Sequence, residues 1–188
     1  SIDPERVMLW KLGDEIQSFF NNPNKVVVIS NACISGVLAI NTAATYINAG
    51  MFDNVVVTGG DLVTRFVISG FMSFLALSPT ACKPFDANRD GLSLGEAAGT
   101  IILSKDRDSK QNSLIFKGGA SANDANHISG PSRDGDGSFI AIKKAMIQAD
   151  IKSEQIDHIS AHGTATPYND EMESISIDRH NLINAPVN

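Results

Sequence analysis

Cys33 follows a run of β-branched residues, VVVISNAC, and an apolar segment with helical spacing comes directly after it. This pattern predicts a thiol at the point where a buried strand meets the start of a helix. The free N–H groups and the positive end of the helix dipole stabilise a thiolate at such a place. The same N–H groups can hold the oxyanion that forms when a thioester is attacked. Cys33 is therefore a candidate nucleophile, while a small buried apolar role is the alternative for a lone cysteine.

A histidine is the natural partner of a thiolate, and His162 fits this role best. It opens the segment HGTATP after a short apolar run. Gly163 permits an unusual backbone conformation there, and the hydroxyls of Thr164 and Thr166 follow. His127 stands in a loop rich in Gly, Asn and Asp, where a role near a site and a turn-stabilising hydrogen bond both fit. His158 is expected to be structural, and His180 is expected to be solvated.

The overall composition limits the kinds of protein that this chain can be. Its 188 residues are 43% hydrophobic, which suits one compact domain or two small ones. The net charge of −6 and the pI near 5.1 argue against general affinity for nucleic acid or an anionic membrane. The two cysteines form no CxxC pair, so we expect a reducing cytoplasm and a structural role for Cys82. No run of about 18 apolar residues is present, and no metal site is predicted.

Hydrophobic periodicity predicts the elements that position these residues. Helices are expected over residues 3–20, 34–49, 138–149 and 171–179. Strands are expected over residues 26–29, 54–59, 97–106 and 113–122, with a short one starting at 158. The order of strand, helix and strand over 26–59 predicts a βαβ unit with a parallel sheet and a buried helix. A long ordered loop is expected over 78–95.

Five segments occur in a fixed order along the chain: NACISG, GFMSFLALS, KPFDANRDGLSLGEAAG, DANHISGP and HGTATPYND. Together they resemble the β-ketoacyl synthase family, the condensing enzymes of fatty-acid and polyketide synthesis. The resemblance runs from about residue 10 to residue 178. It implies an α/β chain with the thiolase-like layered αβαβα fold, with mixed sheets and buried helices, incomplete in this sequence. Residues 1–95 would be the rear part of the N-terminal half and residues 96–188 the front part of the C-terminal half.

The resemblance implies an acyltransferase, a 3-oxoacyl-[acyl carrier protein] synthase, of fatty-acid, polyketide or polyene synthesis. Cys33 would carry the acyl group, and a malonyl thioester would lose carbon dioxide and condense with it. His162 would hydrogen-bond the malonyl thioester oxygen and stabilise the enolate. No tightly bound cofactor is implied, since the substrates are carried on the phosphopantetheine of an acyl carrier protein.

Further residues receive roles by the same resemblance. Thr164 and Thr166 would bind the pantetheine arm, Phe71 would lie near the acyl pocket, and His127 would lie on the loop at the substrate entrance. Glu96 and Asp170 would brace the site.

The expected partners are the acyl carrier protein and a second synthase subunit. The segment NVVVTGGD, residues 54–61, would form the interface of a homodimer or a related heterodimer. An acidic carrier protein calls for a basic docking patch, for which Arg65 and Lys83 are candidates.

The sequence departs from the family pattern and leaves three alternatives open. The family's second active-site histidine and its lysine do not occur before Asn188, so we expect an internal fragment that is inactive in condensation alone. A non-catalytic partner subunit or dimerisation fragment is one alternative, although such subunits usually replace the cysteine. A cysteine hydrolase pairing Cys33 with His162 is another, but the local signature of papain-like enzymes is missing. A thiolase-type enzyme is the third, and Cys82 is a poor match for its second cysteine.

Overall fold

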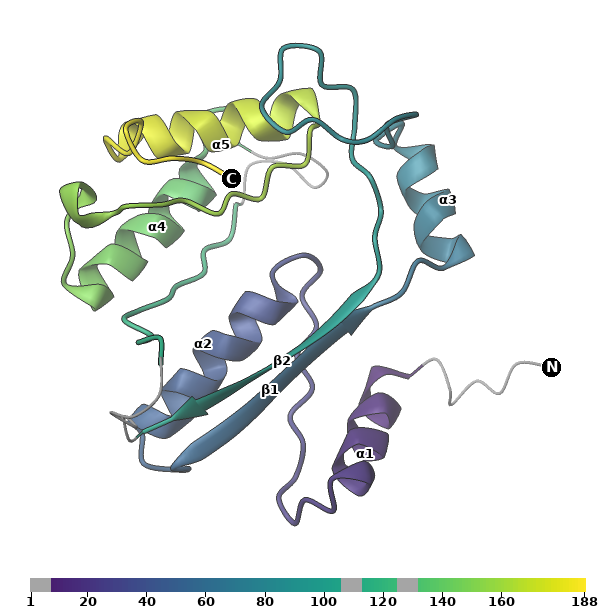
Figure 1. Cartoon of the computed structure of the whole chain (residues 1–188), viewed down its shortest axis with the longest axis vertical. Coiled ribbons are helices and arrows are strands. Elements are labelled where there is room, and N and C mark those ends of the chain that lie inside the picture. The colour runs from purple at the N-terminus through teal and green to yellow at the C-terminus, as the bar shows by residue number, and fades with distance from the viewer. Residues whose placement is uncertain (1–7, 106–112, 125–131) are drawn as a thin grey trace.

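The computed structural model describes residues 8–105, 113–124 and 132–188 (Figure 1). The elements follow in the order α1 (Leu9–Phe19), α2 (Ser35–Asn48), β1 (Asn54–Asp61), α3 (Arg65–Ser73), β2 (Ala97–Ser104), α4 (Asp136–Ala149), a short 3₁₀ helix (Ser153–Gln155) and α5 (Pro167–Arg179). Figure 1 shows α2 beside the long β1–β2 ribbon, with α4 and α5 together in another part of the molecule.

The first packed unit is α2 on the two-stranded sheet. β1 and β2 are antiparallel, with Asn54 opposite Ser104 and Asp61 opposite Ala97. α2 packs against both strands and buries a stripe of small and aliphatic residues, Ala43, Ala44 and Ile47. Side chains alternate along a strand, so the opposite face of this sheet carries exposed apolar residues such as Val56.

The second packed unit is α4 on α5, together with the chain that follows α5. Ile177 and Leu182 are buried there. His180 is buried as well, and its ring stacks on that of Phe139 with centroids 4.3 Å apart, so the expectation that His180 is solvated is wrong. After α5 the chain turns back and lies beside the segment before the histidine motif. The N–H of Ile159 donates to the carbonyl of Pro186 (2.9 Å), which fixes that segment in an extended conformation.

The helix predictions are confirmed and two strand predictions are wrong. Helices cover the expected places among the described residues, and residues 3–7 of the first predicted helix lie outside them. α3 was not predicted. α5 begins at Pro167, four residues before the predicted start, because proline is well suited to the first turn. Residues 26–29 and 113–122 form no strand, so the predicted βαβ unit is wrong. A strand needs a hydrogen-bonded neighbour, and in the described chain neither segment has one.

A large apolar surface remains uncovered by the described elements. The total solvent-accessible surface of the chain is 14164 Å², whereas that of a compact folded monomer of this mass is about 8,700 Å². The predicted burial of the helix at 34–49 is therefore only partial, since Val37 of α2 is 63% exposed. Large exposed apolar side chains include Trp10, Phe19, Phe66, Phe74, Ile102 and Leu114.

Two features are absent from the described residues. None of their helices combines the length and the apolar character that crossing a membrane requires. Across the same residue ranges, no group of three or more His, Cys, Asp or Glu is placed to hold a metal ion.

Candidate active site

Cys33 lies in a tight turn directly before α2, and its side chain is exposed. The hydroxyl of Ser35 closes this turn: it accepts from the N–H of Asn31 (2.7 Å) and donates to the carbonyl of Ala32 (2.7 Å). Ala32 has a φ of 45°, a left-handed conformation that reverses the chain just before the thiol. Cys33 therefore stands at a helix start, as the sequence predicts, and it is exposed rather than buried.

His162 lies on the segment of residues 161–166, called the histidine loop below, and its side chain is exposed. Glu173 of α5 holds the backbone of this loop. Its Oε1 accepts from the N–H of His162 (2.7 Å), and its Oε2 accepts from the N–H of Gly163 (3.0 Å). Gly163 has a φ of 51°, and a Cβ there would lie 3.1 Å from the Cβ of Pro84. One carboxylate thus fixes the two consecutive peptide groups beside the candidate imidazole.

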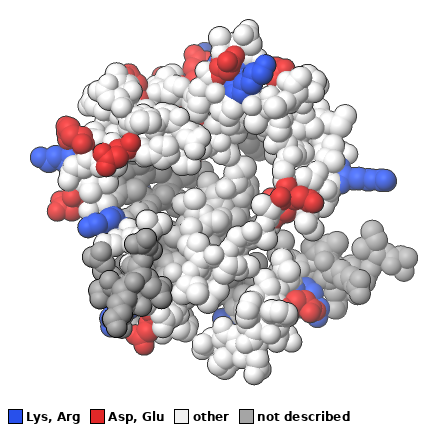
Figure 2. Space-filling model, in the orientation of Figure 1, with Lys and Arg blue, Asp and Glu red and all other residues white. Residues whose placement is uncertain are grey.

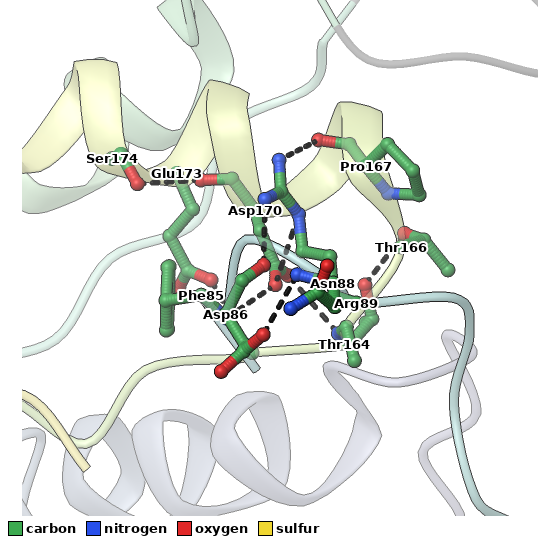
Figure 3. A network of polar contacts seen from close by, with 12 residues as sticks. Phe85, Asp86, Asn88, Arg89, Thr164, Thr166, Pro167, Asp170, Glu173 and Ser174 are labelled. Carbon is green, nitrogen blue, oxygen red and sulfur yellow. Dashed lines mark hydrogen bonds and ion pairs between the residues drawn. The ribbon is translucent and has the colours of Figure 1, made fainter. Parts of the chain in front are cut away.

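Asp170 joins the histidine loop to residues 83–91, called the PFD loop below (Figure 3). Its side chain is 1% exposed. Oδ1 accepts from the N–H of Ala165 (3.1 Å), Oδ2 accepts from the N–H of Phe85 (2.7 Å), and Nε of Arg89 lies 3.7 Å from Oδ2. Ala165 and Phe85 have φ values of 56° and 61°, which are costly for residues with a Cβ. Asp170 therefore stabilises two strained backbone positions at once.

The two threonine hydroxyls of the histidine loop contact each other. Oγ1 of Thr164 and Oγ1 of Thr166 are 2.8 Å apart, and both side chains are half-buried (Figure 3). A hydroxyl carries one donor and two acceptor sites, so each retains capacity for another partner.

The other predicted site residues lie elsewhere. Phe71 is half-buried on α3. Oε2 of Glu96 accepts from the N–H of Val63 (3.1 Å), so this carboxylate holds the segment between β1 and α3 rather than the histidine loop. His127 lies outside the described residues.

Charged side chains leave the middle of one molecular face free. Figure 2 shows uncharged residues at the hollowed centre of this face, with Lys, Arg, Asp and Glu toward its edge. The proposed docking residues Arg65 and Lys83 are both exposed, and they belong to α3 and the PFD loop.

Cys33 and His162 come from different packed units. In Figure 1 the N-terminal end of α2 is the end that points toward α5 and the histidine loop. No hydrogen bond between these two residues occurs in the described chain. The sequence reasoning missed Glu173, and the signal available for it was its helical spacing of three residues from Asp170 in NDEME.

Two family models match the chain in succession. The model of the beta-ketoacyl synthase N-terminal domain matches residues 15–109, and that of the C-terminal domain matches residues 114–182. The chain belongs to the beta-ketoacyl synthase family. The division into 1–95 and 96–188 stays a prediction.

Individual relatives agree with the family models. The 3-oxoacyl-[acyl-carrier-protein] synthase 2 of Vibrio cholerae is 36% identical over 165 residues, which cover 81% of this chain and 40% of the relative. A solved ketosynthase in complex with its chain length factor, from Xenorhabdus doucetiae, superimposes with a TM-score of 0.91 at 32% identity. It covers all of this chain, which matches 46% of that structure. The ishigamide ketosynthase/chain length factor gives a TM-score of 0.88 at 30% identity, covering 98% of this chain and 47% of that one.

These likenesses confirm the predicted fold class, which is α/β of the thiolase-like type. The chain spans about two fifths of the length of the curated relatives that it matches.

Proposed function

We propose that this chain carries the acyl-accepting nucleophile of a 3-oxoacyl-[acyl carrier protein] synthase. In the first step the thiolate of Cys33 attacks the carbonyl carbon of an acyl thioester, and the pantetheine thiolate of the carrier protein leaves. The result is an acyl group on Sγ of Cys33. The exposed thiol at the start of α2, in a chain that belongs to this family, is the observation that carries this proposal.

The second step in this proposal is a decarboxylative condensation. A malonyl thioester loses carbon dioxide, and the electron pair of the broken C–C bond forms an enolate. The enolate carbon then attacks the acyl carbonyl, and the thiolate of Cys33 leaves. His162 donates a hydrogen bond to the thioester oxygen on which the negative charge develops. The Glu173 carboxylate accepts hydrogen bonds from the N–H groups of residues 162 and 163. These bonds support the role of His162, because a donor on a fixed backbone needs little reorganisation during the reaction.

The substrate-binding roles belong to the same proposal. Thr164 and Thr166 bind the pantetheine arm, Phe71 lies near the acyl chain, and His127 lies at the substrate entrance. Glu96 and Asp170 brace the surrounding backbone, which their hydrogen bonds to Val63, Phe85 and Ala165 support. The substrates arrive on an acyl carrier protein, and Arg65 and Lys83 are the candidate contacts for it.

We further propose a dimeric assembly in the cytoplasm. Solved relatives pair a ketosynthase with a chain length factor, which supports a second subunit of the same family without deciding between a homodimer and a heterodimer. β1 is the candidate interface strand, and its exposed Val56 supports this assignment.

The test is intact mass after incubation with cerulenin, an epoxide that alkylates the nucleophilic cysteine of condensing enzymes. We expect a single adduct in the unmodified chain and in Cys82→Ala, and none in Cys33→Ala. The matched Cys82→Ala variant separates activation of one thiol from general reactivity of any thiol. An adduct that persists in Cys33→Ala, or one that forms equally at both cysteines, would refute the assignment of the nucleophile.

A further inference from the structure

Two separate packed groups occur among the helices and strands of the described residues, and α1 and α3 belong to neither. One group is α2 with β1 and β2, and the other is α4 with α5. In the residues that the structure describes, no helix or strand of the first group packs against one of the second. The groups fall within residues 15–109 and 114–182, the ranges matched by the two family models. The position of Cys33 relative to His162 therefore depends on segments outside the helices and strands.

One such segment lies between the groups, and another, the PFD loop, leads into β2 and contacts the second group. Gly119 lies between α2 and α4: its N–H donates to Oε1 of Gln148 (3.0 Å), and a Cβ built on it would lie 3.1 Å from Oδ1 of Asn41. The PFD loop makes the other contact, and this one reaches the histidine loop itself. The N–H of Gly91 donates to the carbonyl of Ala165 (3.0 Å). The PFD loop is thus the described junction that contacts the candidate site directly.

Arg89 is the charged side chain that spans this second junction. Its Nη1 donates to the carbonyl of Asp86 in its own loop (3.0 Å), and its Nη2 donates to the carbonyl of Pro167, the first residue of α5 (3.0 Å). Its Nε faces the buried carboxylate of Asp170 at 3.7 Å. The other ion pair among the described residues, Arg179 with Asp136, lies within the second group. A planar guanidinium can donate to two carbonyls in this arrangement while its charge lies near the carboxylate, whereas the single ammonium of lysine cannot.

We propose that Arg89 is a positioning residue that fixes the histidine loop against the half of the chain carrying Cys33. It acts through two contacts with α5, at Pro167 and Asp170, and does not itself touch the reacting groups. Asp170 in turn accepts a hydrogen bond from the N–H of Ala165, which lies on the same loop as His162. A displacement of Arg89 would therefore move the backbone of the histidine loop. Its value for catalysis rests on the proposed function, but the junction itself can be measured without any activity.

The experiment compares amide hydrogen exchange in the unmodified chain, Arg89→Ala and Arg89→Lys, with Arg179→Ala as the matched control. We expect the N–H groups of Phe85, Gly91 and Ala165 to exchange about tenfold faster or more in Arg89→Ala, while those of α2 and α4 are unchanged. Arg89→Lys should recover only part of the protection. Free guanidinium ion, added to Arg89→Ala at concentrations too low to unfold the chain, should slow these amides again.

A second readout concerns the imidazole. The ring resonances of His162 should shift in Arg89→Ala and return when guanidinium ion is added, a response that a general loss of stability would not give. Three results would overturn the proposal: unchanged loop amides in Arg89→Ala, an equal effect from Arg179→Ala, or full protection in Arg89→Lys. If Arg89→Ala does not fold, the Arg89→Lys comparison decides alone, with selective loss of loop protection as the expected result. If the loop amides respond while cerulenin fails to label Cys33, the positioning role holds and the proposed function fails.

Discussion

Asp170 offers the most direct test of how the candidate site is held together. Replacing it with asparagine keeps the size of the side chain but exchanges one carboxylate oxygen for an NH₂ group. The carboxylate now accepts from the N–H groups of Phe85 and Ala165. In Asp170→Asn one of these N–H groups would face another donor, so one hydrogen bond is lost and one buried N–H has no acceptor.

The expected cost follows from these two losses. A hydrogen bond to a charged group contributes about 1.5–3 kcal/mol, and a buried polar group without a partner costs about 1–3 kcal/mol. Asp170 is 1% exposed, so water offers little compensation. We therefore expect Asp170→Asn to lower the free energy of unfolding by about 3–5 kcal/mol, similar to the loss of one member of a buried ion pair.

Urea unfolding followed by circular dichroism measures this change. With a slope of about 2 kcal/mol/M, the midpoint should fall by roughly 1.5–2.5 M. Asp178→Asn is the matched control, since Asp178 is exposed on the same helix and should change stability by no more than about 0.5 kcal/mol. A loss in Asp170→Asn as small as that of the control would refute the view that this carboxylate stabilises the two strained loops.

Two further predictions concern the same region and α2. Gly91→Ala should destabilise the chain by at least about 2 kcal/mol in urea unfolding, because its Cβ would lie 2.6 Å from the carbonyl oxygen of Ala76 at a φ of 144°. Its control, Gly36→Ala within α2, meets no atom within 4 Å and should stabilise by about 0.5–1 kcal/mol; a similar loss in both would contradict the steric argument. Glu173→Gln should speed amide exchange at residues 162 and 163 about tenfold, since an amide oxygen replaces a carboxylate that accepts both N–H groups. The exposed Glu171→Gln on the same helix should leave those amides unchanged, and slow exchange in both variants would show that Glu173 does not hold the loop.

Helices were predictable because their hydrogen bonds are local. The spacing of apolar residues located α2 and α4 to within two residues of their described ends and α5 to within four, and it placed α1 inside residues 3–20. It did not predict α3. The apolar run at 26–29 has strand-like composition as well, yet it forms no strand in the described chain. Composition cannot supply the neighbouring backbone that a strand requires.

The residues of the candidate site that lie in short sequence motifs were predictable, whereas the contacts between segments distant in the sequence were not. Cys33 before a helix and His162 before a glycine could be located from their immediate neighbours. The part played by Glu173 could not, because a glutamate on a polar helix is usually solvated. Its importance follows from the way α5 faces back onto the histidine loop, which is a tertiary property.

The amino-acid sequence by itself determined the positions of α1, α2, α4 and α5, the order of the family motifs and the fold class, because each depends on short stretches of neighbouring residues. The tertiary structure alone decided which groups meet across long separations. The hydrogen bond between Phe85 and Asp170 joins residues 85 positions apart. Many carboxylates in this chain could have accepted that N–H, and only folding places Asp170 where one buried side chain satisfies two strained loops and faces Arg89.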